Sequence, residues 1–567
     1  MALLDWIVIG IFALALIGVI LWVMRQKQNN AADYFLGGKD ATWIAIGASI
    51  FASNIGSEHL IGLAGSGASS GMAMAHWEIQ GWMILLLGWV FVPFYTRSMV
   101  YTMPEFLEKR FNPQSRTILA TISLISYVLT KVAVTVYAGG LVFQQVFGID
   151  TLWGIDFFWI AAIGLVVITA LYTIFGGMKS VLYTSVLQTP ILLLGSLIIL
   201  VLGLKELGGW DEMMRICSNV KVNDYGDSMV NLIRDNNDPE YPWLGSLIGS
   251  AVIGFWYWCT DQFIVQRVLS GKDEKEARRG TIFGAYLKLL PVFLFLIPGM
   301  IAFAIHQNAI AGGGEGFLPM LANGNVNSDA AFPTLVAKLL PAGVKGLIVC
   351  GILAALMSSL ASLFNSSAAL FTIDFYQRYR PKTDPKKLVR IGQTATVVIV
   401  ILGILWIPVM RSVGDVLYLY LQDVQSVLSP GIAAAFLIGI LWKRATAQGG
   451  MWALLSGLII GLTRLGAKVY YSNADMLPGG DGNWFQSIFY DCNWLFFCGW
   501  MLVFCLAVGV IVSLFTKAPE PQKIQGLVFG TSTAEQRAAT RASWNHWDII
   551  NSVIIIGITV AFYIYFW

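Results

Sequence analysis

The chain has 567 residues, of which 57% are hydrophobic and only 12% charged, and its formal net charge is +3. A soluble domain usually carries about twice this charged fraction. A soluble protein of this composition could not cover its surface with polar groups, whereas a protein surrounded by lipid does not have to. The small net charge and the lack of a Lys/Arg run alternating with aromatic residues outside the loops exclude a nucleic-acid-binding protein, so we expect an all-α integral membrane protein.

The apolar segments predict about fourteen membrane-spanning helices, because each span needs roughly 20 apolar residues. The first is predicted to be a retained helix, since Asp5 stands where a cleavable signal has basic residues and no A-x-A-like site follows. In chain order the predicted spans are 5–24, 43–70, 72–96, 117–147, 153–176, 180–204, 244–266, 280–306, 344–373, 390–410, 416–440, 448–470, 493–515 and 547–567.

Basic connections follow alternate spans, which predicts the orientation of the chain. The clusters are RQK at 25–27, EKRF at 108–111, GKDEKEARR at 271–279, RYRPKTDPKKLVR at 378–390 and KR at 443–444. Cytoplasmic loops carry an excess of Lys and Arg. We therefore expect a multi-pass protein of the cell membrane, inner or plasma, with both termini extracellular or periplasmic.

The order of spans predicts two halves of five helices each, at 43–204 and 244–440. A duplicated unit with an odd number of spans inverts its topology, as in inverted-repeat transporters. The remaining divisions are a first helix with a cytoplasmic loop at 1–42, an outer loop at 205–243, and C-terminal helices at 441–567.

Polar residues interrupt the first helix of each predicted half, and such breaks mark substrate sites in inverted-repeat transporters. In the first half the interruption is 54–59, with Glu58 and His59 at its end; in the second it runs from Gly254 to Asp261. Unwound backbone frees carbonyl groups that a cation can satisfy. The small residues 65–67 favour close helix packing instead.

Ionisable residues inside spans are costly and are usually paired or functional. Glu78 has two candidate partners, Lys131 and Lys288, while Glu58 and Asp261 are candidates for ion pairs at helix ends. No HExxH, P-loop or GxSxG motif occurs, so an enzyme is not expected. Cys217 and Cys492 lie in polar loops, where a bridge or two unrelated thiols are the alternatives, the second being favoured.

The stretch DYFLGGKDATWIAIGASIFASNIGSEHLIGLAGSGASSGMAMAHWE at 33–78 resembles the sodium/solute symporter family, most closely its sodium/glucose (galactose) cotransporters. Further matches are YTMPEFLEKRF at 101–111, WYWCTDQFIVQRVLSGK at 256–272, LKLLPVFLFLIPGM at 287–300, MSSLASLFNSSAALFTIDFY at 357–376 and SPGIAAAFLIGILWKR at 429–444. The resemblance covers the chain from Asp33 to Trp567. It implies a LeuT-type core of two inverted five-helix repeats, in agreement with the organisation above.

The resemblance also implies the site residues. For sodium they are the carbonyl groups of Ala52, Ile55 and Ala355 and the hydroxyl groups of Ser358 and Ser359. For a sugar they are Asn54, His59, Glu78, Tyr257, Trp258, Lys288 and Gln422. The hydrophobic gates are Leu63, Trp77 and Tyr418 on the outside and Tyr257 on the inside.

Some positions depart from the family pattern. Ser185 replaces an Asp that the family usually carries in a second sodium site, so one sodium per sugar is expected. Lys131 stands where the bacterial galactose symporter has a sugar-binding Asn, and Gly81 and Gly254 lack side chains at its other sugar contacts.

The expected function is sodium-driven import of a monosaccharide, glucose or galactose, by alternating access. Uptake of another solute, such as a polyol or sialic acid, and a sugar sensor that gates ion flow are the alternatives. Sodium, the solute and the lipid bilayer are the expected partners, with no obligate protein partner.

Overall fold

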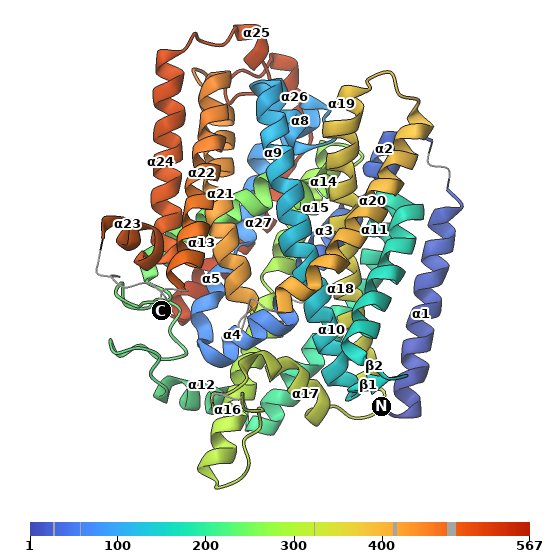
Figure 1. Ribbon diagram of the computed structural model, residues 1–567, viewed down its shortest axis with the longest axis vertical. Helices are drawn as coiled ribbons and strands as arrows, with labels where there is room; N and C mark the ends of the chain where they lie inside the picture. The colour runs from blue at the N-terminus through green and yellow to red at the C-terminus, as the bar shows by residue number, and fades with distance from the viewer. Residues whose placement is uncertain (27–28, 57, 322–323, 412–416, 473–482) are drawn as a thin grey trace.

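A computed structural model describes residues 1–567 except 27–28, 57, 322–323, 412–416 and 473–482. Long helices run side by side from one end of the molecule to the other (Figure 1). Among the described residues the only sheet is a hairpin, β1 (Thr151–Leu152) paired antiparallel with β2 (Ile155–Asp156). The predicted all-α membrane class is therefore confirmed.

The helical elements up to the outer loop are α1 (Leu3–Met24), α2 (Ala31–Phe35), η1 (Gly37–Lys39), α3 (Trp43–Asn54), η2 (Glu58–Leu63), α4 (Ala64–Ser69), η3 (Gly71–Met74), α5 (Ala75–Glu78), α6 (Gly81–Leu86), η4 (Leu87–Phe91), α7 (Val92–Ser98), α8 (Met103–Arg110), α9 (Pro113–Ser126), η5 (Tyr127–Val132), α10 (Ala133–Phe147), α11 (Phe157–Leu207) and α12 (Trp210–Asn219).

The later elements are α13 (Trp243–Gly254), η6 (Phe255–Thr260), α14 (Gln262–Leu269), α15 (Glu274–Lys288), η7 (Val292–Leu296), α16 (Ile297–Ala311), η8 (Ser328–Ala330), α17 (Ala331–Leu339), α18 (Val344–Ala369), η9 (Leu370–Tyr376), α19 (Gln377–Tyr379), α20 (Pro385–Arg411), α21 (Leu417–Leu441), α22 (Ala447–Ser472), α23 (Trp484–Gln486), η11 (Ser487–Asp491), α24 (Trp494–Phe515), α25 (Pro521–Ile524), α26 (Ala534–Ala542) and α27 (His546–Tyr565).

Ten helices among the described residues are long and apolar enough to cross a membrane. One of them, α11, has 51 residues and contains two of the predicted spans, which meet at Gly177. This glycine has a φ of 54°, and a Cβ there would lie 2.5 Å from the Tyr34 carbonyl oxygen, so a larger residue would not fit. Predicted spans 43–70, 117–147 and 244–266 are each divided into shorter helices, and the number fourteen stays a prediction.

Wide π turns divide several spans near their middle. They are η2, η4 and η5 in the first half and η6, η7 and η9 in the second. π turns occur mostly as single-turn bulges and frequently at functional sites. Glu58 and His59, at the end of the first predicted interruption, begin η2, and the second predicted interruption, 254–261, contains η6. The other four π turns were not predicted.

The small residues of α4 allow two helices to approach closely, as predicted for 65–67. A Cβ on Gly67 would lie 2.2 Å from the Leu296 carbonyl oxygen, and one on Gly299 would lie 1.9 Å from the Ala64 carbonyl oxygen. Backbone therefore packs on backbone between α4 and α16, which is the membrane use of small residues.

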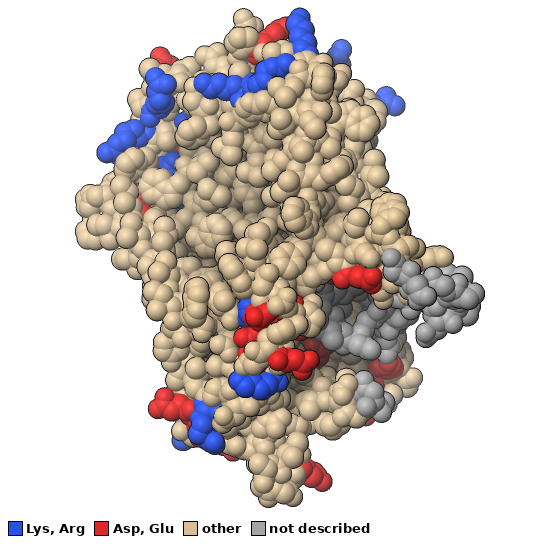
Figure 2. Space-filling view, turned by 90° about the vertical axis from the view of Figure 1, so that its left-hand side faces the viewer, with Lys and Arg blue, Asp and Glu red and all other residues tan. Residues whose placement is uncertain are grey.

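The two ends of the molecule differ in charge. On the face shown in Figure 2, most Lys and Arg side chains gather at the upper end, acidic side chains gather toward the lower end, and the band between them has few charged groups. Both termini lie in the lower half of Figure 1, away from the upper end where α25 and α26 lie. The orientation of the termini relative to the membrane stays a prediction.

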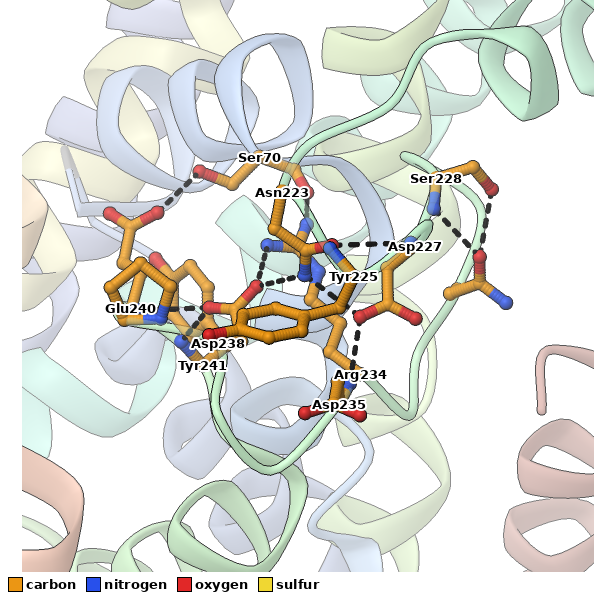
Figure 3. Close-up of polar contacts among 12 residues, drawn as sticks. Ser70, Asn223, Tyr225, Asp227, Ser228, Arg234, Asp235, Asp238, Glu240 and Tyr241 are labelled. Carbon is orange, nitrogen blue, oxygen red and sulfur yellow. Dashed lines mark hydrogen bonds and ion pairs between the residues drawn. The ribbon is translucent and has the colours of Figure 1, made fainter.

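The loop between α12 and α13 is held by polar contacts (Figure 3). Asn223 Nδ2 donates to Asp227 Oδ2 at 2.8 Å and to Asp238 Oδ2 at 2.6 Å. Arg234 donates to the Ser70 carbonyl oxygen, and Ser70 Oγ donates to Glu240 Oε2 at 3.3 Å. The loop is thereby fixed to the first broken helix.

Cys217 and Cys492 are free thiols, so the favoured alternative of two unrelated cysteines is confirmed. Cys217 lies on α12, and burial raises its pKa to about 12. A thiol that stays protonated at neutral pH is a poor nucleophile, so this cysteine is unreactive.

Candidate substrate and sodium sites

A cavity of about 380 Å³ lies where the two broken helices meet. Its walls come from the end of α3, η2, α5, α13, η6, the end of α15 and α21. All seven residues predicted to contact a sugar line it. The full lining is Asn54, Glu58, His59, Trp77, Glu78, Gln80, Ile253, Gly254, Tyr257, Trp258, Lys288, Gln422 and Gln425.

Glu78 is the centre of the polar network in this cavity. Its Oε2 accepts from Lys288 Nζ at 2.6 Å and lies 3.2 Å from His59 Nε2. Lys288 Nζ also donates to Asn54 Oδ1 at 3.2 Å. Of the two candidate partners for Glu78, the structure describes Lys288 as the bonded one. Buried charges are tolerated in membranes when they pair in this way.

Two aromatic residues of η6, Tyr257 and Trp258, line the cavity. Asn54 Nδ2 donates to the Tyr257 hydroxyl at 3.1 Å, and Trp258 Nε1 donates to Gln80 Oε1 at 3.2 Å. The Lys288 ammonium lies 5.3 Å from the centre of the Trp258 ring. Rings held by polar contacts offer rigid apolar faces to a cyclic solute.

Lys131 lies behind Tyr257 and outside the cavity lining. Its Nζ donates to Asp261 Oδ2 at 2.7 Å and lies 4.7 Å from the centre of the Tyr257 ring. Asp261 also accepts from the Tyr127 hydroxyl and caps α14 at Phe263. Asp261 is thus in a buried ion pair, as one alternative predicted. Lys131 does not line the cavity, but its ammonium group lies against the ring of Tyr257, which does.

Sequence reasoning missed Gln80, Gln425 and Ile253, and it placed Glu58 both in the interruption 54–59 and among the candidates for an ion pair. The absence of a side chain at Gly254 has a local explanation: a Cβ there would lie 2.5 Å from Gln80 Oε1, so Gln80 occupies that space. Gln80 could have been found from its position two residues after Glu78, between α5 and α6. A search for costly intramembrane charges passes over neutral amides.

The structure describes the side chains of two of the three residues predicted to form the outer gate, Trp77 and Leu63. Trp77 lines the cavity and stacks on Trp494 with ring centres 5.5 Å apart. Leu63 is fully buried at the end of η2. The side chain of Tyr418 lies outside the described residues.

Two of the predicted sodium ligands, the Ile55 carbonyl group and the Ser359 hydroxyl group, lie next to each other between the end of α3 and α18. Helix α3 ends at Asn54, and Ile55 is extended with φ −79° and ψ 103°, which turns its carbonyl group out of the helix. Ser359 Oγ lies 3.3 Å from the Ile55 carbonyl oxygen and 2.9 Å from the Ser53 carbonyl oxygen. Ala52 and Ala355 are both buried. Neutral oxygens in a dry site suit a hard monovalent cation, so this donor set fits sodium.

A second group of hydroxyls lies beside this set. Ser358 Oγ is 3.1 Å from Ser185 Oγ, which is 3.5 Å from Ser49 Oγ. Ser185, which the resemblance implies stands in place of an Asp, therefore contacts a predicted sodium ligand.

The comparisons with known proteins agree with this geometry. A family model described as "Sodium:solute symporter family" matches residues 34–457. The human sodium/myo-inositol cotransporter 2 is 37% identical over 542 residues, which cover 93% of this chain and 79% of that protein. The human sodium/myo-inositol cotransporter is 36% identical over 532 residues, which cover 89% and 72%.

A solved structure of a Na⁺-coupled sialic acid symporter has a TM-score of 0.72 at 22% identity and covers 92% of this chain and 99% of its own. The chain is thus a sodium-coupled secondary transporter with a LeuT-type fold, and not an enzyme. It belongs to the sodium:solute symporter family.

Proposed function

We propose that the chain imports a neutral cyclic polyol together with sodium, with myo-inositol as the first candidate and glucose or galactose as the second. The proposal rests on three buried polar atoms that have no hydrogen-bond partner among the described residues and belong to residues lining the cavity: His59 Nδ1, Trp77 Nε1 and Gln422 Oε1. Buried polar groups are normally satisfied, so unsatisfied donors and acceptors on the walls of one cavity favour a ligand rich in hydroxyl groups.

The charges of the lining favour a neutral solute over an acid such as sialic acid. Lys288 is bonded to Glu78, and Glu58 adds a second carboxylate to the wall. A carboxylate ligand would meet these groups without an unpaired cation, and burying an unpaired charge is costly. The curated relatives named above are myo-inositol cotransporters, which supports the choice of polyol.

Tracer uptake into proteoliposomes tests this proposal. We expect sodium-dependent accumulation of labelled myo-inositol, competition by glucose or galactose, and no competition by sialic acid. Accumulation of glucose that myo-inositol does not inhibit would contradict the order of candidates. Sodium current without accumulation of any of these solutes would favour the sensor instead.

We also expect one sodium per solute. Ser185 supplies no formal negative charge, and a cation in a low-dielectric site depends strongly on such a charge. One sodium at a potential of about 100 mV provides roughly 2.3 kcal/mol, and a tenfold gradient adds about 1.4 kcal/mol. The limiting accumulation should then be several hundredfold, with a sodium Hill coefficient near one. A reversal potential of solute-coupled current that fits two sodium ions would overturn this stoichiometry.

We propose further that both termini face the outside and that the protein resides in the inner or plasma membrane. The basic loops at the opposite end of the molecule support this orientation. Labelling of cysteines placed at either terminus by a membrane-impermeant reagent on intact cells tests it, since termini inside the cell would stay unlabelled.

A further inference from the structure

A second hollow lies on the outside of the helix bundle, at the end where three helices begin. Its volume is about 840 Å³, and it is formed by the first turns of α3 and α27 and by one face of α15. The lining residues are Trp43, Arg279, Ile282, Phe283, Tyr286, Asn545, Trp547, Asp548 and Asn551. None of them belongs to the solute or sodium site.

The hollow contains one ion pair between aromatic walls. Arg279 Nε donates to Asp548 Oδ1 at 3.2 Å, and the arginine side chain remains 29% exposed. A guanidinium has five N–H donors, so it can bind a phosphate bidentately while this bond is kept. Trp43 and Trp547 are 37% and 60% exposed and can lie against an ammonium group.

The charge of the hollow is balanced. Arg279 and Asp548 are the two charged residues among those that line it, and their formal charges cancel. Glu276 lies at the rim, where its Oε2 accepts from the Trp43 backbone N–H at 2.7 Å. An anionic head group would find no excess positive charge here, whereas a group with a phosphate and an amine would find a partner for each.

The position suits a lipid. The connections before α3 and α15 carry the basic clusters 25–27 and 271–279, which mark this end as a membrane interface. Tryptophan and tyrosine are enriched at that depth of the bilayer. Next to the hollow, Ile44 on α3 and Ile550 and Val553 on α27 are 47%, 42% and 60% exposed, and they offer an apolar surface to acyl chains.

We propose that this hollow binds a zwitterionic phospholipid of the phosphatidylethanolamine type, with the phosphate on Arg279, the amine toward Asp548, and the acyl chains along α3 and α27. The lipid would join the last helix to the first helix of the core at one interface. This proposal does not depend on which solute is transported.

Native mass spectrometry of the purified full chain tests the proposal with phosphatidylethanolamine, phosphatidylglycerol and diacylglycerol as probes. We expect one retained phosphatidylethanolamine per chain, bound at least tenfold more tightly than either of the others. Arg279→Gln should weaken that binding at least tenfold. Arg390→Gln, which changes an exposed arginine on α20 outside the hollow, should leave it unchanged.

Equal or tighter binding of phosphatidylglycerol, or unchanged retention in Arg279→Gln, would overturn the proposal. Full displacement by soluble phosphoethanolamine at concentrations close to those of the lipid would also overturn it, because the acyl chains would then contribute nothing. If Arg279→Gln does not fold, Trp547→Ala replaces it, since this side chain is 60% exposed and its loss removes a wall of the hollow. Unchanged binding in Trp547→Ala then contradicts the site.

Discussion

Replacing Glu78 with alanine should lower the affinity for the transported solute by a hundredfold or more. The carboxylate is buried and bonded to Lys288 at 2.6 Å, so its removal leaves a buried ammonium without its counter-charge. A site built to hydrogen-bond hydroxyl groups loses about 10⁴–10⁵ in discrimination when a bonding partner is missing, because other buried polar groups are then left unpaired. The measurement is the concentration dependence of sodium-driven uptake in proteoliposomes, together with sodium-induced thermal stabilisation, which should persist.

Two variants separate loss of binding from loss of stability. Asp374→Ala removes the carboxylate of another buried pair, with Arg116 at 2.7 Å, which is remote from the cavity lining. It should reduce thermal stability while the half-saturating solute concentration stays within about twofold. Gln422→Ala removes an uncharged acceptor and should weaken binding at least tenfold but less than Glu78→Ala. Normal transport by both Glu78→Ala and Gln422→Ala would place the solute elsewhere.

Sodium-dependent uptake should be lost in Ser359→Ala, although the protein should still insert and fold. The Ser359 hydroxyl lies within 3.3 Å of the Ile55 carbonyl oxygen and is 5% exposed, so no bulk water can replace it as a ligand. The expected result is a rise of at least tenfold in the sodium concentration needed for half-maximal uptake, measured alongside sodium binding without solute.

Ser367→Ala is a matched control for this variant. It removes the same atom from the same helix, and Ser367 is equally enclosed at 0% exposure, but it lies about two turns beyond the predicted site. Its sodium affinity should equal that of the unchanged chain. Wild-type sodium affinity in Ser359→Ala would refute the ligand assignment, whatever the control shows.

The membrane class, the LeuT-type core and the breaks near Asn54 and Asp261 were predicted from the sequence. Hydropathy and costly intramembrane charges are local signals, and each can be recognised along the chain. The predicted solute residues came from the resemblance to the sodium/solute symporter family, and all of them line one cavity.

The pairing of the charges could not be predicted, because it depends on distances between spans. Glu78 had two candidate lysines, and only the packing of α15 against α3 and α6 brings Lys288 to Glu78, which lies just before α6, while Lys131 pairs with Asp261. Gln80 was missed for the same reason, since an amide does not show in the sequence that it faces a cavity.

The π turns have a consequence for how the chain can change in length. A π turn holds one residue more than an α turn, so it can lose a residue and leave a continuous α-helix whose flanking faces keep their direction. A deletion inside an α-helical stretch would instead rotate everything beyond it by about 100°. In η4 (Leu87–Phe91), which does not line the solute cavity, a relative one residue shorter can keep the same packing. In η6 (Phe255–Thr260) the same deletion would withdraw Tyr257 or Trp258 from the solute. In an alignment of relatives, single-residue gaps should therefore be common in η4 and absent in η6.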